Sequence, residues 1–244
     1  MDITINDGIF FRKLVSSIKE LTNMTEFTFD QRGISVQAMD IARVCLIDVL
    51  LPKQTFEKYI VPKPVKLGFN FENLNNILKL SKNSSIRINY KADSDKILLN
   101  VSEHIHKKIE FEMNLVSIEE EAVQVTEIQH EFIVFLDTDE FQKSIKDLAA
   151  FGDKCTIAVT KNDITFITEG EAGTGKISID DVEIDINGAD EPHISLTFNT
   201  KYLVMFAKAN LSDQVTLKLS ATQPFCCEYT LDEGFVRFYL GHII

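Results

Sequence analysis

The sequence of 244 residues predicts an α+β fold made of two similar domains that follow one another along the chain. Two observations lead to this prediction: an internal repeat of apolar positions, and four short amphipathic helices set among many short strands. Hydrophobic residues make up 45% of the chain and charged residues 25%, which suffices for the core of one large domain or of two smaller ones.

The repeat appears when residues 11–40 are aligned with residues 141–170 at a constant offset of 130. Residues 67–88 align with residues 196–217 in the same order, at an offset of 129. Few residues are identical, but the apolar positions coincide. Two nearly equal offsets over half the chain indicate two copies of one domain.

These offsets predict an N-terminal domain at residues 1–115 and a C-terminal domain at residues 131–244. Residues 116–130, "VSIEEEAVQVTEIQH", are polar and acidic and have no helical periodicity. We therefore expect them to form a connector between the two domains.

Helices are predicted at four places: residues 9–22, 71–81, 139–150 and 200–209. In the third of them, for example, Phe141, Ile145 and Leu148 share one face. Strands are predicted elsewhere, because stretches such as "KIEFEMNL" at residues 108–115 alternate apolar and polar residues. Many short strands separated by turn residues favour antiparallel sheets with the few helices on one side.

The net charge of −12 argues against unspecific adhesion to nucleic acid or to an anionic membrane, but it leaves room for a local basic surface. No apolar run is long enough to span a membrane, and the acidic Asp2 is unlike a signal peptide, so we expect an intracellular protein without membrane association.

The four cysteines form no C-x-x-C unit, so they are expected to be buried thiols and not zinc ligands.

Basic residues lie on or beside the solvent side of every predicted helix. They are Arg12, Lys13, Lys19, Lys79, Lys143, Lys146, Lys201 and Lys208. Lysine on a single exposed helix face is usual and serves solubility. Its repetition in all four helices of an acidic chain favours a surface that meets phosphate.

One stretch raises the alternative of a nucleotide-binding enzyme, because Gly170-x-x-x-x-Gly175-Lys176 is one residue short of a phosphate-binding loop. Such a loop needs Ser or Thr after the lysine and a helix from there on. Here Ile177 follows, and its alternation with Ile179 predicts a strand, so the glycines are expected to form a hairpin turn.

Other candidate chemistry is weak. His104 and His106 could share one side of a strand, but a polar strand end is the preferred interpretation over a metal site. Asp137 and Asp139 are expected to cap the third helix and not to form an acid–base pair. We predict no catalytic residues, no cofactor and no metal.

The chain resembles a eukaryotic or archaeal sliding clamp of the proliferating cell nuclear antigen family. The resemblance rests on residues 33–47, 67–83, 139–153, 196–209 and 228–244, in the order and spacing of the family. It implies the DNA-clamp fold, in which each domain has antiparallel sheets outside and two helices inside, and three chains form a ring around double-stranded DNA. The eight basic residues would face the DNA, and Asn76 replaces a basic residue that the family often has.

The resemblance also implies a docking pocket for short partner peptides with a hydrophobic plug. The matching positions are Met39, Arg43, Val44, Leu46, Val125, Ile128, Pro224, Tyr239, Leu240, Gly241 and His242. The ending "YLGHII" departs from the usual Tyr-Leu-Ala-Pro-Lys-Ile at His242 and Ile243, so partner preference is expected to differ. The implied partners are a clamp loader, DNA polymerase, other proteins with clamp-binding peptides, and further copies of the chain.

Subunits would join edge to edge, with Lys176–Asp181 of one chain pairing with Lys107–Leu115 of the next. The interface positions implied are Ile109, Phe111, Met113, Gly175, Ile177 and Ile179. A checkpoint-type clamp subunit and one member of a heterotrimer remain alternatives to a homotrimer. The implied location is the nucleus for a eukaryotic protein and the cytoplasm for an archaeal one, and a virus-encoded protein is a further alternative.

Overall fold

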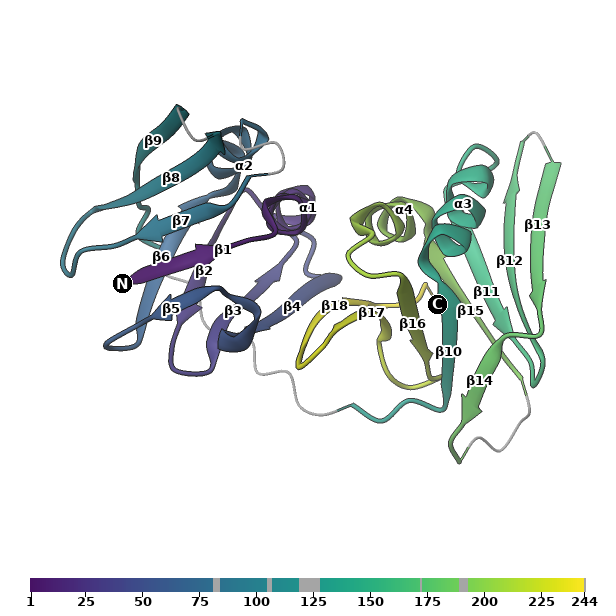
Figure 1. Ribbon diagram of the computed structural model, residues 1–244. Coiled ribbons are helices and arrows are strands. Elements are labelled where there is room, and N and C mark those ends of the chain that lie inside the picture. The colour runs from purple at the N-terminus through teal and green to yellow at the C-terminus, as the bar shows by residue number, and fades with distance from the viewer. Residues whose placement is uncertain (81–83, 105–106, 119–127, 172, 189–192, 244) are drawn as a thin grey trace. The chain divides into compact units, whose positions relative to one another are not determined.

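The computed structural model describes residues 1–80, 84–104, 107–118, 128–171, 173–188 and 193–243 (Figure 1). The chain folds into two compact units. The first comprises Met1–Ile41, Ile47–Val123 and Asp232–Phe235; the second comprises Ala42–Leu46, Gln124–Leu231 and Val236–Ile244. The predicted connector falls largely outside the described residues, so its limits stay a prediction.

The first unit contains two helices, α1 (Gly8–Leu21) and α2 (Phe71–Lys79), and a short 3₁₀ helix at Lys53–Thr55. Its strands are β1 (Asp2–Ile5), β2 (Met24–Phe29), β3 (Gly33–Met39), β4 (Cys45–Pro52), β5 (Lys58–Ile60), β6 (Val65–Asn70), β7 (Ile86–Asn89), β8 (Lys96–His104) and β9 (Lys107–Asn114). They are arranged in the orders β5-β1-β7-β8-β9 and β4-β3-β2-β6.

The second unit contains α3 (Thr138–Leu148) and α4 (Thr200–Ala209). Its strands are β10 (Phe132–Asp137), β11 (Lys154–Val159), β12 (Asp163–Gly170), β13 (Gly173–Asp180), β14 (Glu183–Ile186), β15 (Ile194–Asn199), β16 (Gln214–Leu219), β17 (Phe225–Leu231) and β18 (Gly234–Leu240). Their orders are β14-β10-β16-β17-β18 and β13-β12-β11-β15.

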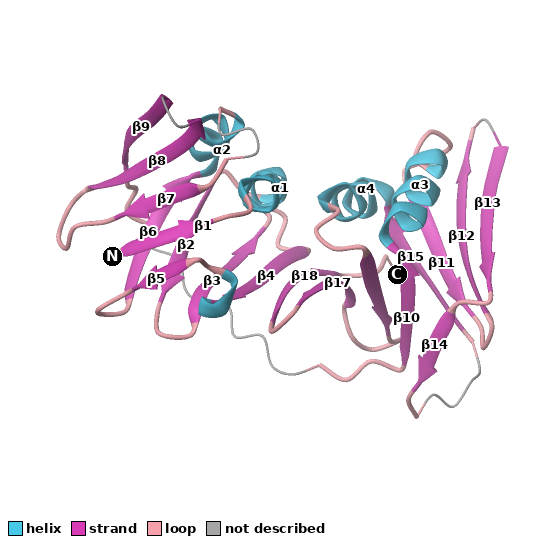
Figure 2. Cartoon of the chain, viewed as in Figure 1, coloured by secondary structure: helices cyan, strands magenta, loops and turns pink. Residues whose placement is uncertain are grey.

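The two units repeat one topology, which confirms the predicted internal repeat. The first strand of each unit lies between the fifth and the seventh: β1 pairs antiparallel with β5 and β7, and β10 pairs antiparallel with β14 and β16. The second strand pairs with the third and the sixth in both units. In each unit the two helices pack against each other (Figure 2).

The helices end within two residues of the predicted limits, and a side chain caps each at its start. Asp7, Asn70, Asp137 and Asn199 accept bonds from the first free backbone N–H groups of α1, α2, α3 and α4, respectively. Asp137 is thus a cap, as the sequence predicted, while Asp139 lies within the first turn of α3.

The core of each unit joins the helices to the sheets through aromatic side chains. In the first unit Phe27 lies 6.5 Å from Phe11 of α1 and 5.1 Å from Phe69 of β6, measured between ring centroids. In the second unit Phe206 of α4 stacks 4.8 Å from Phe238 of β18. Burial of such rings supplies much of the driving force for folding.

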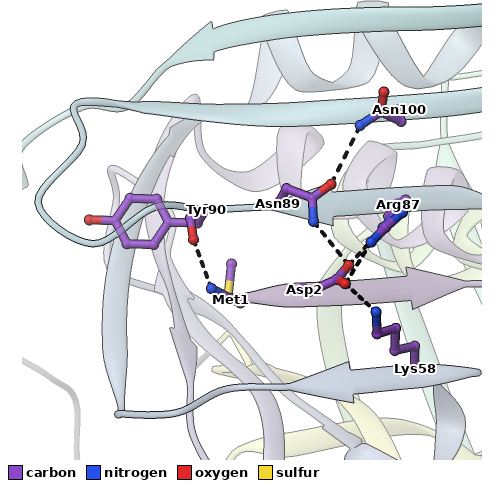
Figure 3. Close-up of polar contacts among 7 residues, drawn as sticks. All are labelled: Met1, Asp2, Lys58, Arg87, Asn89, Tyr90 and Asn100. Carbon is purple, nitrogen blue, oxygen red and sulfur yellow. Dashed lines mark hydrogen bonds and ion pairs between the residues drawn. The ribbon is translucent and has the colours of Figure 1, made fainter.

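Asp2 of β1 contacts side chains on both neighbouring strands, β5 and β7 (Figure 3). Its two carboxylate oxygens accept bonds of 2.7 Å each from Nε and Nη2 of Arg87 on β7. Asn89 Nδ2 donates to it at 2.9 Å, and Lys58 on β5 also forms an ion pair with it. The bonds from Arg87 and Lys58 hold the pKa of Asp2 well below its usual value although burial acts in the opposite direction.

All four cysteines are free and buried, as predicted from their apolar surroundings. Burial raises the pKa of Cys226 to about 12, so its thiol stays protonated and unreactive at neutral pH. Among the helices in the described part of the chain, none is long and apolar enough to cross a membrane.

Candidate functional site

The basic side chains lie where the periodicity placed them, on the solvent side of the four helices. Six of the predicted positions are exposed: Lys13, Lys79, Lys143, Lys146, Lys201 and Lys208. Arg12 and Lys19 of α1 are half-buried, and Lys19 Nζ lies 3.8 Å from Glu72 Oε1 of α2. The ammonium of Lys201 stands 4.7 Å from the ring centroid of Tyr202, a cation–π contact on α4.

The structure brings these residues together within each unit. Because α1 packs on α2, the four basic residues of the first unit share its helical side. Because α3 packs on α4, Lys143, Lys146, Lys201 and Lys208 share that of the second. In the second unit Gln142 Nε2 donates to the carbonyl of Ala207 at 2.9 Å, which fixes α3 against α4.

Charge separates between the helices and the remainder of the chain. The four helices carry eight basic and five acidic residues, a net charge of +3, whereas the other residues carry 17 basic and 32 acidic ones, a net charge of −15. Three of the five acidic residues are on α3. Two of these, Asp139 and Glu140, lie in its first turn, where the helix dipole favours negative charge.

The helix dipole offers a second explanation for the position of some of these lysines. Each helix has one lysine in its last turn, namely Lys19, Lys79, Lys146 or Lys208. A cation there compensates the helix dipole. Lys143 and Lys201 lie outside the last turn, so the dipole does not account for them.

The predicted docking residues fall into a buried and an accessible group. Leu46, Tyr239 and Leu240 are at most 9% exposed and form part of the core of the second unit. Arg43, Val44, Pro224 and Gly241 are exposed, and Met39, Ile128 and His242 are intermediate. Val125 lies outside the described residues.

One backbone contact joins two accessible docking residues of the second unit, Val44 and Gly241. Gly241 N donates to the carbonyl of Val44 at 3.1 Å, so the end of β18 lies beside a residue that is 46% exposed. Two residues further on, Ile243 N donates to the carbonyl of Thr197 at 2.8 Å and joins the C-terminal segment to β15. Met39 belongs to the first unit.

The two strands of the predicted interface, β9 and β13, are edge strands of their sheets. In the described structure β9 pairs only with β8, and β13 pairs only with β12, so one side of each strand has no neighbouring strand. On β9 Ile109 and Phe111 are half-buried and Met113 is buried; on β13 Gly175 and Ile177 are half-buried and Ile179 is buried.

An apolar residue beside β13 escaped the sequence reasoning. Phe151, just after α3, is 41% exposed. A Cβ at Gly175 would stand 2.7 Å from Leu148 Cδ2 and 3.4 Å from Phe151 Cδ2, so both side chains lie against the backbone of β13. Its one sequence signal is a large apolar residue following the last periodic position of the helix.

Ile41 also escaped notice and is almost fully exposed in the turn before β4. Its one sequence signal is a large apolar residue in the short turn at residues 41–44, directly after Asp40.

The structure does not support nucleotide chemistry at residues 170–176. Gly170 ends β12, and Gly173–Asp180 forms β13, which pairs with β12 in a hairpin. Lys176 therefore lies inside a strand and does not precede a helix, whose N-terminal N–H groups a phosphate loop requires.

Of the predicted histidine pair, His106 and the side chain of His104 lie outside the described residues. Among the described side chains, no group of three or more His, Cys, Asp or Glu residues could hold a metal ion.

The chain matches two family descriptions that together span nearly its whole length. Residues 1–123 match "Proliferating cell nuclear antigen, N-terminal domain", and residues 124–243 match "Proliferating cell nuclear antigen, C-terminal domain". The chain belongs to the proliferating cell nuclear antigen family.

The proliferating cell nuclear antigen of Saccharomyces cerevisiae is 28% identical over 251 residues, which cover 99% of this chain and 97% of the yeast protein. That of Chaetomium thermophilum is 29% identical over 256 residues with the same coverage. In fold, the crystal structure of proliferating cellular nuclear antigen from Entamoeba histolytica superposes with a TM-score of 0.92 at 32% identity, covering 100% of this chain and 98% of that one.

These matches confirm the DNA-clamp fold with two similar domains, and the chain is accordingly a DNA sliding clamp of this family, a class that acts in DNA replication and repair.

Proposed function

We propose that three copies of this chain close into a ring around double-stranded DNA, with the four helices of each copy facing the DNA. The observation that carries this proposal is the net charge of +3 on the helices of a chain whose other residues carry −15. The remainder of the chain, with its net negative charge, is on average unfavourable to contact with a polyanion.

The chemistry of the helices suits a protein that moves along DNA. Lysine ammonium groups bind phosphate oxygens without reading the bases, so the contacts are alike at every position of the duplex. Few such contacts give weak binding, and salt weakens them further. In a closed ring weak contacts are sufficient, because the ring itself retains the DNA and weak contacts allow it to slide.

We further propose that β13 of one copy pairs with β9 of the next. Both strands have an unpaired side, and an unprotected edge strand is a site at which another chain adds. The half-covered apolar side chains of Phe111, Phe151 and Ile177 would become buried when the edges join.

The docking residues of the second unit are proposed to hold peptides from DNA polymerase, the clamp loader and other partner proteins. Val44, Pro224 and Gly241 supply accessible apolar and backbone surface above the buried Leu46, Tyr239 and Leu240. In this role the ring is a scaffold without catalysis of its own. By analogy with its fungal relatives we place it in the nucleus.

Retention on DNA of different topology tests the ring directly. The protein is loaded by a clamp loader onto nicked circular DNA and the circle is then cut once. We expect stable retention on the circle, rapid loss after cutting, and restored retention when bulky proteins block both ends. Equal retention on circular and on open linear DNA would refute the proposed ring.

Light scattering on the purified chain decides the composition of the ring. A homotrimer has about three times the mass of 27.7 kDa. A monomer that assembles only with other subunits would instead support a heterotrimeric or checkpoint-type clamp.

A further inference from the structure

Two consecutive side chains at the start of the second unit hold the two ends of one loop. The loop Ser220–Pro224 connects β16 to β17. Glu131 accepts a bond from Ala221 N at 3.0 Å, and its own N–H donates to the carbonyl of Leu219 at 3.1 Å. His130 Nε2 lies 2.9 Å from the carbonyl oxygen of Pro224.

The His130 contact is directional. A carbonyl oxygen only accepts, so Nε2 carries the proton and donates to Pro224. The ring is 7% exposed, and water therefore offers little replacement for this bond. Three further residues act electrostatically on the ring: the backbone of Ile128, and the charged side chains of Lys218 on β16 and Glu228 on β17.

His130 therefore lies between two residues of the proposed docking site. Ile128 is two residues before it in the chain and half-buried, and Pro224 is exposed at the end of the loop. The ring bonds directly to the carbonyl of Pro224. A residue at this position fixes the spacing of the two apolar side chains that an arriving peptide would meet.

We propose that His130 is a positioning residue for the peptide-docking site, where its bond to Pro224 holds the loop Ser220–Pro224 against the chain segment Ile128–Glu131. This inference rests on the proposed docking function. It goes beyond that function by assigning the role to a residue outside the docking set.

Both the neutral and the protonated ring carry a proton on Nε2 and can donate it to the carbonyl of Pro224. Burial first, and then the charge of Lys218, lower the pKa of His130, while the two carbonyls and Glu228 act in the opposite direction. A histidine with a lowered pKa in the folded protein stabilises the fold above the unfolded value of about 6.5. That stabilisation is lost as the pH falls below this value, because the protonated ring places a charge at a buried position, and the bond from Nε2 to Pro224 is not itself removed.

The test compares His130→Ala with His130→Gln, which keeps an N–H donor, and with His193→Ala, an exposed histidine of the same unit. Hydrogen exchange at one pH is measured for the backbone of residues 128–131 and 220–226. We expect faster exchange in both segments for His130→Ala and exchange close to wild type for the other two variants. Unchanged exchange in His130→Ala would overturn the inference, whatever the protein binds.

The second readout is the affinity of a fluorescein-labelled peptide from the clamp-binding segment of a DNA polymerase. At pH 7.5 we expect about fivefold weaker binding to His130→Ala, the factor that one neutral hydrogen bond provides. His130→Gln, which keeps an N–H donor, should bind the peptide with an affinity close to that of wild type.

The outcomes separate the two proposals. Equal peptide affinity for wild type and His130→Ala contradicts a positioning role, even where exchange differs. A wild-type protein that binds no peptide at any pH refutes the docking function and the inference with it, yet leaves the exchange result as evidence for the loop contact.

Discussion

Asp7 and Asp137 make the same contact at the start of the first helix of each unit. Asp7 Oδ1 accepts from the backbone N–H of Phe10 at 2.8 Å, and Asp137 Oδ1 accepts from that of Glu140 at 3.1 Å, three residues on in both cases. The two aspartates are separated by the same 130 residues as the apolar repeat. The repeat thus extends from the core pattern to the groups that start the helices.

Replacing either cap should destabilise its unit. Asp137→Ala and Asp7→Ala leave helix N–H groups without a bond, and we expect each to lower the free energy of unfolding by about 1 kcal/mol. Asp137→Asn is the control, because asparagine caps almost equally well. Urea denaturation followed by circular dichroism measures the effect, and equal loss in Asp137→Asn and Asp137→Ala would point to charge and not to capping.

Asp2 should contribute to stability in a manner that depends on pH. Asp2→Asn removes the charge that pairs with Arg87 and Lys58, and we expect a loss of about 1 kcal/mol at pH 7. Because the pKa of Asp2 is lowered in the folded protein, its contribution is present above the unfolded value of about 4 and is lost as the pH falls further.

Denaturation at pH 7, 5 and 3 checks this dependence on pH. The difference between wild type and Asp2→Asn should be equal at the first two values and smaller at the third. Asp95→Asn, which changes an exposed carboxylate of the same unit, should have little effect at any of them. A difference between wild type and Asp2→Asn that does not vary with pH would show that packing, and not charge, is responsible.

The lysines of α3 distinguish DNA contact from compensation of the helix dipole. Lys146 lies in the last turn of the helix and Lys143 does not, although both are exposed. If both face DNA, Lys143→Ala and Lys146→Ala should each lower the slope of log affinity against log salt by about 0.9. If the lysines only compensate the helix dipole, Lys146→Ala alone should lower the free energy of unfolding, by about 0.3–1 kcal/mol. In that case neither substitution should alter the affinity for DNA.

Fluorescence anisotropy with a labelled duplex at several salt concentrations measures these slopes. Lys161→Ala is the matched control, since it removes the same charge from the exposed turn between β11 and β12. A slope that falls equally in Lys161→Ala would reveal a general charge effect and no specific DNA-facing surface.

Local sequence patterns predict the helices and the hairpin at Gly170. The helices follow from a period of 3.6 residues, and the cap of the third helix follows from an acidic residue just before it, Asp137. The hairpin at Gly170 follows from the alternation of Ile177 and Ile179, which excludes the helix that a phosphate loop needs. Both patterns are properties of neighbouring residues, so no knowledge of distant contacts was necessary.

The burial of side chains that depends on distant contacts could not be predicted from the sequence. Leu46 and Tyr239 could fill a core or line a groove, and only the folded structure of the second unit shows that both are buried. His130 carried no signal at all, because its partner Pro224 is 94 residues away in the chain. The exposure of Phe151 likewise depends on where α3 meets β13.

The proposed ring edge is best tested at Phe111, not at Ile179. Ile179 is 9% exposed and pairs with Ile164 inside the second unit, so Ile179→Pro would disturb that unit's own sheet. Phe111 is half-buried on the open edge strand β9.

Phe111→Ala therefore removes apolar surface mainly from the contact between copies. Truncation of a large aromatic residue at the centre of an interface costs about 2 kcal/mol or more, and each ring contains three such contacts. We expect light scattering after size exclusion to find monomers of Phe111→Ala at concentrations where wild type is a trimer. Ile60→Ala, at the exposed edge strand β5, should remain trimeric. A trimer of Phe111→Ala that persists on dilution as wild type does would place the contact between copies elsewhere than on β9.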